Sequence, residues 1–467
     1  MSHPRYPDYA QLNLAQVQKD ILGQWEEEGA FEKSVTLRAG APSFVFYEGP
    51  PSANGLPGIH HVMARTLKDA FCRYKTQKGF LVDRRAGWDT HGLPVELGVE
   101  KELGITKEDI GKKLSVAEYN QACREAVMRY TGIWNDLTRQ MGYWVDRENP
   151  YVTYETKYME TVWWILSQMH QKGYLYKGYT IQPYSPKAGT GLSSHELNQP
   201  GCYKDVTDTS VTAQFEIKDT AESRALFSDR PVFVLAWTTT PWTLPSNTAL
   251  TVGPKITYAE IATTNPYTGI PVHVVVAEAL ASTYFKSEEE GLQWQKIQTF
   301  TGAQLVGLRY HQLLPYAQPY QNAEQAFRII SGDFVTTEDG TGVVHTAPTF
   351  GADDARVAAA AGVPPLLILD DQGNPVPLVD LQGKFVAQAG ALAGKFVKND
   401  YYAEGEQPAL SVDEEIAIQL KKENKAFKVQ KYVHSYPHCW RTDTPVLYYP
   451  LTVGLFGRLP SKSNCKT

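Results

Sequence analysis

Two adjacent histidines, His60 and His61, follow a turn rich in proline, glycine and asparagine, in the run YEGPPSANGLPGIHHV that begins at Tyr47. Residues 43–47 predict a strand before this turn, and the periodic pattern over 62–78 predicts an amphipathic helix after it. A strand, a turn and a helix N-terminus form a site for phosphate groups, because backbone N–H groups and the helix dipole face the ligand. The alternative is a plain turn before a helix.

A second motif lies close by and reads Trp-Asp-Thr-His-Gly-Leu-Pro over 88–94. Together the two motifs resemble those of the class I aminoacyl-tRNA synthetases, most closely the isoleucine branch, and the resemblance covers residues 1 to about 450. Valine enzymes look like Gly-Thr-Asp-His-Ala-Gly at the second motif, and leucine enzymes like Trp-Asp-Ala-Phe-Gly-Leu-Pro. It implies an α/β fold in which the first half of a Rossmann-type catalytic domain is interrupted by a mainly β editing domain.

The first family signature, His-Ile-Gly-His, matches Gly58, Ile59, His60 and His61, with departures at Gly58 and His60. The resemblance implies that these four residues and Asn54 bind ATP, supplied with Mg²⁺ as substrate. His60 and His61 would be the catalytic pair, holding the phosphates and stabilising charge on phosphorus as the amino-acid carboxylate attacks. Such catalysis is positioning plus electrostatics.

The second motif implies a site for the amino acid. By resemblance, the carboxylate of Asp89 binds the substrate ammonium in a charge-assisted bond, and Pro50 forms one wall of the side-chain pocket. The alternative for Asp89 is a helix N-cap, since Asp-Thr before an apolar stretch suits one.

Composition is compatible with a cytoplasmic enzyme. A chain of 467 residues is long enough for about three domains. It has no apolar run of membrane-spanning length and no apolar signal region, so we expect a soluble, cytoplasmic protein that does not bind membranes. The 5 cysteines are odd in number and scattered, which argues against a disulfide framework.

The net charge of -6 does not advertise nucleic-acid binding, so local charge matters more. Basic residues cluster over 65–85 and again over 421–431. Either cluster could contact a tRNA backbone, and the alternative is a solvated helix face.

Periodic apolar patterns predict helices over 12–28, 116–141 and 154–172. From about residue 190 the sequence pattern changes and predicts short strands separated by glycine and proline. These strands are 211–217, 231–237, 273–279 and 327–335. We therefore expect an N-terminal helix and first catalytic half over 1–190, an inserted editing domain over 191–400 and a return segment over 401–451.

A hydroxyl-rich segment over 237–247 carries three adjacent threonines, each of which needs hydrogen-bond partners. A Thr-rich edge strand is the alternative. A second segment, Gly-Thr-Gly-Val-Val-His-Thr-Ala-Pro over 340–348, precedes Asp354. Both segments resemble the editing domain of the isoleucine, valine and leucine synthetases.

That resemblance assigns Asp354 to the ammonium of a misattached amino acid and His345 to the pocket wall and the terminal ribose. The residues that would line the site and position the attacking water are Thr238, Thr239, Thr240 and Asn247. The alternatives are a satisfied core histidine at 345 and a helix cap at 354.

Relatives of this type carry Cys-x-x-Cys elements at 185–188 and 439–442, a spacing suited to structural zinc. This chain retains only Cys439 of the four cysteines, so we expect no zinc. Cys439 is then a partly buried thiol.

The family continues Asp-Ser-Trp-Phe-Ile-Arg after Leu451, whereas this chain does not. Permitted codons for 451–460, read from the third nucleotide, encode that family sequence. We therefore predict a single-nucleotide deletion in the codon of Leu451 and an out-of-frame tail over 452–467; the alternative is an ordinary divergent C-terminus. The second ATP signature, Lys-Met-Ser-Lys-Ser, does not occur in these residues.

The resemblance implies ATP-dependent activation of isoleucine, its transfer to tRNA(Ile) and hydrolytic editing of mischarged valine. Its partners would be tRNA(Ile), isoleucine and ATP. Two further readings stay open: an editing deacylase fragment without adenylate formation, and an inactive tRNA-binding remnant.

Overall fold

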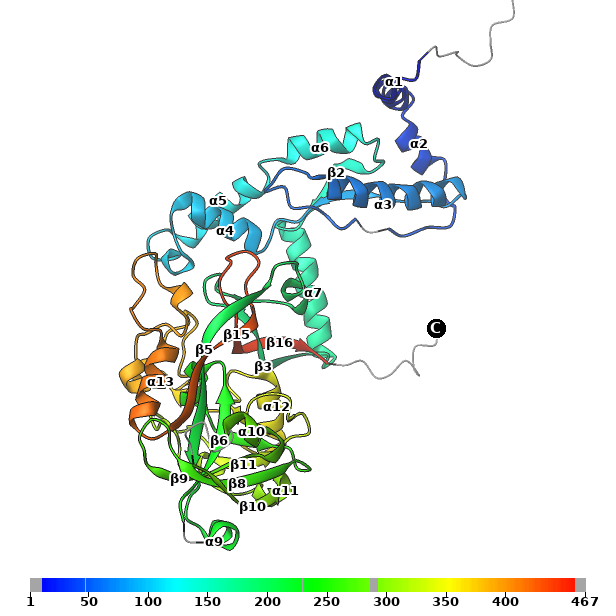
Figure 1. Ribbon diagram of the computed structural model, residues 1–467. Helices are drawn as coiled ribbons and strands as arrows, with labels where there is room; N and C mark the ends of the chain where they lie inside the picture. Colours follow the sequence, from blue (N-terminus) through cyan, green and yellow to red (C-terminus); the bar gives the residue numbers. More distant parts are fainter. Residues whose placement is uncertain (1–10, 47, 229, 286–292, 458–467) are drawn as a thin grey trace, which may run out of the picture. The chain divides into compact units, whose positions relative to one another are not determined.

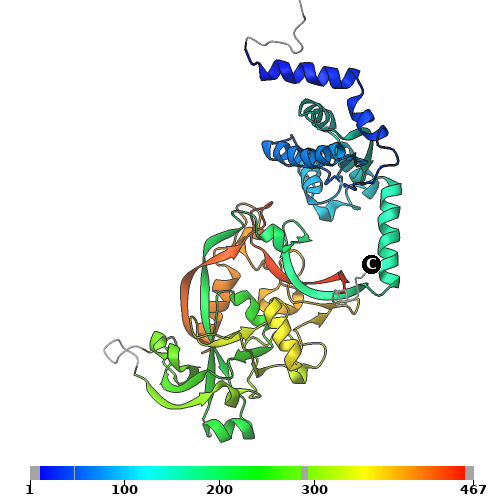
Figure 2. The ribbon, with the colours of Figure 1, turned by 90° about the vertical axis from the view of Figure 1, so that its right-hand side faces the viewer.

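The computed structural model describes residues 11–46, 48–228, 230–285 and 293–457. The chain divides into two compact units (Figures 1 and 2). Unit 1 comprises 1–176 with 456–467, and unit 2 comprises 177–455. The domain boundaries predicted at 190, 400 and 451 remain predictions.

Unit 1 is built from helices around a short parallel strand pair. Its helices are α1 (Leu14–Glu27), α2 (Ala30–Thr36), α3 (Ile59–Gln77), α4 (Leu93–Leu103), η1 (Lys107–Asp109), α5 (Val116–Val127), α6 (Thr131–Gln140) and α7 (Thr156–Gln171). Strands β1 (Arg85–Trp88) and β2 (Asp146–Val152) pair in parallel, with Trp88 opposite Val152. The predicted helices over 12–28, 62–78 and 154–172 are confirmed.

A small apolar core joins the turn before α3 to this strand pair. It contains Ala53, Trp88, Trp134 and Val152, all buried. The Trp134 indole N–H also donates to the carbonyl of Gly55 at 2.9 Å. Trp134 therefore contacts the turn in two ways: its ring packs in the apolar core, and its indole N–H binds a carbonyl of the turn.

Two predicted elements of unit 1 are wrong in extent. Ser43 forms only an isolated parallel bridge with Leu81, so 43–46 is not a strand, and Tyr47 lies outside the described residues. The predicted helix over 116–141 is two helices, because the Tyr130 amide leaves the helical pattern and donates to the carbonyl of Ala53 at 3.2 Å. That bond ties the helix junction to the turn.

Unit 2 is organised by one large mixed sheet. In the described part of the chain it has 9 strands in the order β10-β8-β9-β6-β12-β7-β11, with β5 paired to β6 and β15. Figure 1 shows β5 and β15 as a long, curved pair. Its strands are β5 (Tyr203–Glu216), β6 (Val232–Thr238), β7 (Ala249–Val252), β8 (Thr257–Thr264), β9 (Pro271–Ala277), β10 (Gln295–Thr301), β11 (Arg328–Ser331), β12 (Val343–Thr346) and β15 (Ala426–Pro437).

Short helices and turns surround this sheet. They are α8 (Ser194–Leu197), α9 (Ala221–Phe227), η2 (Pro241–Ser246), η3 (Glu278–Leu280), α10 (Ala281–Tyr284), α11 (Gly302–Leu305), η5 (Ala323–Gln325), α12 (Ala352–Ala361), η6 (Ala387–Leu392), η7 (Asn399–Tyr401) and α13 (Val412–Lys422). The four strands predicted from 211 to 335 are confirmed as β5, β6, β9 and β11. Apolar side chains on the sheet form a continuous core that includes Phe215, Leu235 and Ile261, each fully buried.

Two smaller sheets complete the chain. Strands β13 (Ile368–Leu369) and β14 (Pro375–Val376) pair with each other, and β16 (Leu447–Phe456), β3 (Leu175–Ser185) and β4 (Thr190–Gly191) form the other sheet. The predicted out-of-frame tail lies partly within β16, and 458–467 lie outside the described residues. The deletion in the codon of Leu451 stays a prediction.

Candidate functional site

The most informative site is a pocket of about 410 Å³ within unit 2. Its lining comes from the end of β6, the first turn of η2, the loop and strand at 334–345, and the start of α12. The lining residues are Trp237, Thr238, Thr239, Thr240, Thr243, Phe334, Val335, Thr336, Asp339, Gly340, Thr341, Gly342, Val343, Val344, His345, Ala347, Phe350 and Asp354. The structure therefore brings together two segments about 100 residues apart that sequence reasoning had paired.

Strand register explains why these segments meet. Val344 on β12 lies opposite Trp237 on β6 in a parallel pair, and His345 lies opposite Leu250 on β7. Strand β6 is interior to the sheet, so the alternative of a Thr-rich edge strand over 237–247 is wrong. Residues 241–246 form η2 instead, which begins with Pro241 because proline suits the first helical position.

His345 is held by a directional chain of hydrogen bonds. The Tyr310 hydroxyl donates to Asn247 Oδ1 at 2.7 Å, and the Asn247 amide group donates to Ala249 O and lies 2.8 Å from His345 Nδ1. Because that amide nitrogen is a donor, Nδ1 is the acceptor and Nε2 carries the proton. Nε2 lies 3.0 Å from the hydroxyl of Thr243, which donates to the carbonyl of Thr240 at 2.8 Å.

Burial keeps His345 neutral. Burial lowers the pKa of His345 to about 3, so the ring stays uncharged across the physiological range. Both ring nitrogens are used within the protein, as the satisfied-histidine alternative requires, and the ring also lines the pocket. A contact from a ring nitrogen to a ribose hydroxyl would require one of these bonds to be exchanged.

Asp354 is one of two carboxylates in the pocket lining, the other being Asp339. It lies in the first turn of α12, whose N-cap is Gly351, so the helix-cap alternative for Asp354 is wrong. Its Oδ2 accepts from the Ala347 amide at 2.8 Å. Burial raises the pKa of Asp354 to about 6, which leaves the group ionised at neutral pH.

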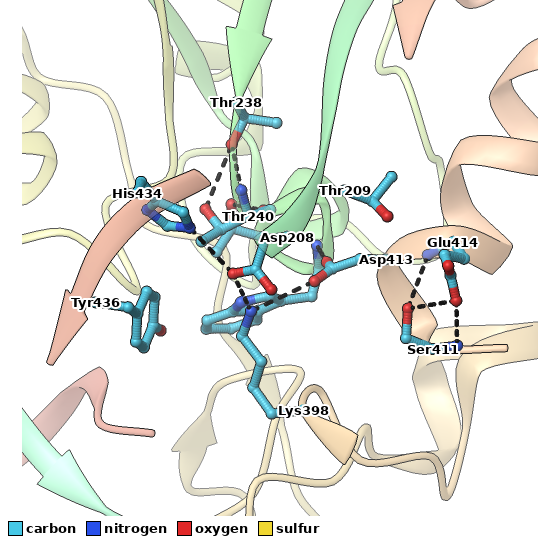
Figure 3. A network of polar contacts seen from close by, with 12 residues as sticks. Asp208, Thr209, Thr238, Thr240, Lys398, Ser411, Asp413, Glu414, His434 and Tyr436 are labelled. Carbon is cyan, nitrogen blue, oxygen red and sulfur yellow. Dashed lines mark hydrogen bonds and ion pairs between the residues drawn. The ribbon is translucent and has the colours of Figure 1, made fainter. Parts of the chain in front are cut away.

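The three adjacent threonines play different structural parts. Thr238 Oγ1 accepts from the Thr240 amide at 3.1 Å and lies 3.3 Å from the Thr240 hydroxyl (Figure 3). Thr239 lines the pocket, and within the described part of the chain its hydroxyl makes no hydrogen bond. Asn247 lies behind His345 and not in the lining, so its place is to orient the imidazole.

Sequence reasoning missed several residues of this site. Thr243 and Tyr310 complete the hydrogen-bond chain through His345, and Gly342 allows the turn before β12 to approach Ala277 at the end of β9. Gly342 has a positive φ of 71°, and a Cβ there would overlap the Cβ of Ala277. The Gly-Thr-Gly pattern is a detectable signal for this turn, whereas Tyr310 belongs to no motif.

The predicted phosphate site of unit 1 lies at the N-terminus of α3. The Gly58 amide donates to His61 Nδ1 at 2.9 Å, which leaves the His61 proton on Nε2. Burial, followed by the neighbouring His60, lowers the pKa of His61. The His60 ring lies 3.8 Å from that of His61, and a Cβ at Gly58 would come within 2.8 Å of His60 Cε1.

The two departures from the family signature are therefore spatially linked. In this structure the imidazole of His60 occupies the space next to the Cα of Gly58. A histidine at 58 is sterically compatible only if the ring at 60 moves. Asn54 lies in the turn between Ala53, which is buried, and Gly55, which accepts from Trp134.

The second motif is brought next to the first. The Asp89 amide donates to the carbonyl of Pro51 at 3.0 Å, which places Asp89 beside the turn that carries Pro50. The N-cap of α4 is Gly92, so the N-cap alternative for Asp89 is wrong, and its side chain is exposed. Thr153 fixes the following residue, because its hydroxyl accepts from the Thr90 amide at 3.0 Å.

Two of the basic side chains in the cluster over 65–85 are buried inside unit 1. The guanidinium of Arg65 is buried over the Trp134 ring at 5.0 Å, and that of Arg84 is buried near Asp69 at 3.7 Å. Neither is a solvated charge nor free for a tRNA phosphate. In the cluster over 421–431, Lys431 pairs with Glu414 at 2.8 Å and stays largely exposed.

Cys439 is fully buried, which goes beyond the partial burial expected. Over the described ranges, no group of three or more His, Cys, Asp or Glu side chains is arranged to hold a metal ion. None of the helices in the described part of the chain is long and apolar enough to cross a membrane.

Comparison with known proteins decides the family. The profile of the tRNA synthetases class I (I, L, M and V) matches residues 20–438. The chain belongs to this family. The predicted α/β class, with a catalytic half interrupted by a mainly β domain, is thereby confirmed.

Within this family the chain is similar to isoleucine-tRNA ligases. It is 56% identical to that of Bacteroides thetaiotaomicron over 96% of this chain and 42% of the relative. It is 58% identical to that of Cytophaga hutchinsonii over 94% of this chain and 41% of the relative. That of Treponema denticola is 42% identical over 94% of this chain and 39% of the relative. The resemblance to the isoleucine branch is confirmed, and the chain spans about two-fifths of the length of these relatives.

Proposed function

We propose that the pocket of unit 2 hydrolyses tRNA that carries the wrong amino acid, as the editing site of an isoleucine-tRNA ligase. One observation carries the proposal: three adjacent threonines, the neutral ring of His345 and the ionised carboxylate of Asp354 line one pocket of about 410 Å³. Valine on tRNA(Ile) is the substrate that the similarity to isoleucine-tRNA ligases implies. Isoleucine and valine differ by one methylene, which supplies only about 1–3 kcal/mol of discrimination, and this pair of amino acids is the standard example. Some valine is therefore activated and attached to the tRNA by mistake.

Asp354 is proposed to bind the substrate ammonium. Its carboxylate has two oxygens, of which Oδ2 accepts from the Ala347 amide, and the side chain retains acceptor capacity toward the pocket. A charge-assisted bond of this kind orients the aminoacyl group and rejects substrates without a free amine.

The threonine hydroxyls are proposed to orient the attacking water. Thr238 and Thr240 bond each other and so fix the geometry of the segment. Thr239 has no partner within the described part of the chain, so its hydroxyl is free to hold water against the ester carbonyl. An aminoacyl ester is already activated, and orientation supplies much of the acceleration that hydrolysis needs.

His345 is proposed to act as a rigid wall of the pocket. Its neutral ring and its two occupied nitrogens make it unsuited to removing a proton from water at neutral pH. Asn247 holds that ring from behind. In this proposal the site is selective because its shape and the carboxylate of Asp354 are fixed before the substrate arrives.

For the whole protein we propose ATP-dependent ligation of isoleucine to tRNA(Ile) in the cytoplasm. The residues of unit 1 fit the ATP phosphates: α3 presents its N-terminal amides, and the neutral ring of His61 presents a proton on Nε2. His60 is proposed to supply the second ring in place of position 58. Mg²⁺ bound to ATP would neutralise part of the phosphate charge, Pro50 would contact the isoleucine side chain and Asp89 would bind its ammonium.

The test is the release of valine from valyl-tRNA(Ile) by the purified chain, with isoleucyl-tRNA(Ile) as the matched control. Faster hydrolysis of the valyl ester, abolished by Thr239→Val, supports the proposal. Isoleucine-dependent exchange between ATP and pyrophosphate measures the ligase half separately. Hydrolysis without exchange supports a deacylase fragment, and loss of both supports a tRNA-binding remnant; equal hydrolysis of both esters contradicts an editing role.

A further inference from the structure

A buried lysine lies next to the hydrolytic pocket without lining it. Lys398 precedes η7 and is 7% exposed. Its ammonium lies 2.8 Å from Asp208 Oδ2 and 3.5 Å from Asp413 Oδ2, and 5.0 Å from the centre of the Tyr436 ring. Figure 3 shows this group, in which His434 also contacts Asp208, at 3.1 Å. A buried ammonium is tolerated only with such partners.

The second of these carboxylates faces two ways. While Asp413 Oδ2 faces Lys398, its Oδ1 accepts from the backbone amide of Trp242 at 2.8 Å. Trp242 is the second residue of η2, and the N-cap residue Thr240 provides no side-chain bond to the helix. The first amides of a helix have no partner within it, and Pro241 has no amide proton. Asp413 therefore caps η2 from α13.

That cap is continuous with the pocket. Immediately after Trp242, the Thr243 hydroxyl joins Thr240 O to His345 Nε2. The ring of Trp242 packs edge-on against Phe350, which lines the pocket, with centroids 5.0 Å apart. A shift of the Trp242 backbone would move the threonine segment on one side and an apolar wall on the other.

We propose that Lys398 and Asp413 are positioning residues for the hydrolytic pocket: Lys398 orients the Asp413 carboxylate, and Asp413 anchors η2 so that the threonine hydroxyls are set before substrate binds. This inference rests on the proposed editing function. Neither residue is in the pocket lining, so both act through Trp242 and not on the substrate. Misplacement of oriented groups lowers the rate of the chemical step more than it lowers binding.

The competing interpretation is a structural ion pair that only joins β5, β15 and α13. The chain offers a matched control for this interpretation. Lys395, in the same loop as Lys398, pairs with Glu415, which lies on α13 as Asp413 does. That pair is more exposed than the Lys398 pair. Glu415 lies two residues after Asp413 on α13 and makes no bond to η2. Lys395→Met therefore removes a lysine–carboxylate pair without touching the cap.

The experiment measures single-turnover hydrolysis of valyl-tRNA(Ile) by the full chain and its variants. We expect Asp413→Ala and Lys398→Met to lower the maximal rate by about 10-fold while the half-saturating concentration changes less than about twofold. Asp413→Asn keeps an acceptor for the Trp242 amide and is expected to recover most of the rate. Lys395→Met is expected to match the wild type.

Amide hydrogen exchange provides a readout that does not depend on the reaction. We expect faster exchange over 240–246 in Asp413→Ala and Lys398→Met, and unchanged exchange there in Lys395→Met. Unchanged exchange in Asp413→Ala, or a rate loss equal in Asp413→Asn and Asp413→Ala, overturns the proposal. If the wild type itself does not hydrolyse valyl-tRNA(Ile), the editing function fails, and exchange over 240–246 still decides whether Asp413 anchors η2.

Discussion

The sharpest consequence of the pocket concerns the charge of Asp354. Replacing Asp354 by Asn keeps the size of the side chain and an oxygen that accepts from the Ala347 amide. It removes only the negative charge that is proposed to bind the substrate ammonium. The neighbouring Asp353 provides the matched control, since its side chain is 76% exposed and pairs with Arg356 at 3.0 Å.

The size of the effect follows from the kind of bond that is lost. A hydrogen bond to a charged group contributes about 1.5–3 kcal/mol, and about 1.4 kcal/mol corresponds to a factor of ten. We therefore expect Asp354→Asn to lower kcat/KM for valyl-tRNA(Ile) by about 10-fold to 150-fold. The ammonium is bound in the ground state as well as in the transition state, so most of the loss is expected in KM.

The pH dependence gives an independent test of the same group. The pKa of Asp354 is about 6, raised by burial, so the carboxylate is neutral at pH 5 and charged at pH 7.5. Wild-type hydrolysis is expected to fall as the pH drops through 6, and Asp354→Asn is expected to lose this dependence. Because burial raises the pKa of Asp354 in the folded state, the neutral carboxyl group stabilises the fold relative to the charged one. This contribution to stability is present at low pH and is lost as the pH rises through about 6.

The assay is the initial rate of valine release between pH 5 and 7.5, corrected for spontaneous ester hydrolysis. Burial also raises the pKa of Asp413 to about 6. A dependence that survives in Asp354→Asn but disappears in Asp413→Asn therefore belongs to Asp413. Wild-type kcat/KM and an unchanged pH profile in Asp354→Asn would refute the role of Asp354, and a loss of activity in Asp353→Asn would show that the effect is not specific.

Two further predictions concern the space around a glycine and the charge of an imidazole. Gly342→Ala is expected to destabilise unit 2 by about 1–3 kcal/mol, because the new Cβ overlaps Ala277. The control is Gly269→Ala, which has the same φ of 71° but open space around the new Cβ, so the difference between the two variants in thermal unfolding measures the clash apart from the backbone strain. His60→Ala is expected to raise the pKa of His61 toward its ordinary value, since His60 is the second cause of its lowering after burial; an unchanged value in an NMR titration would contradict the close approach of the two rings.

Apolar periodicity predicted several helices and strands, and contacts between residues distant in the sequence decided the features that it missed. The strands of unit 2 carry alternating apolar residues and good turn residues, so four of them were predictable. The break between α5 and α6 depends on a bond from Tyr130 to Ala53, residues that are far apart in the sequence. Apolar periodicity cannot predict such a bond, because the pattern describes only the residues within one helix or strand.

The candidate site shows the same division. His345, Asp354 and the threonines belong to contiguous motifs, and their resemblance to editing domains placed them in one site. Lys398 and Asp413 belong to no motif, and their pairing depends on where η7 and α13 meet β5. A lysine followed by Asn-Asp in a loop is typical of a solvated turn, and only tertiary structure reveals that it is buried.

The proposed hydrolysis therefore depends on geometry. In the described part of unit 2, His345 is neutral with both nitrogens bonded, and the carboxylate of Asp354 is proposed to be occupied by the substrate ammonium. Neither His345 nor Asp354 is then available to take a proton from water at neutral pH, and we propose orientation by the threonine hydroxyls as the main source of acceleration. The rate is then expected to depend on how rigidly η2 is held, so substitutions at Asp413 and Lys398 behind the pocket should lower the rate of hydrolysis although neither residue lines it.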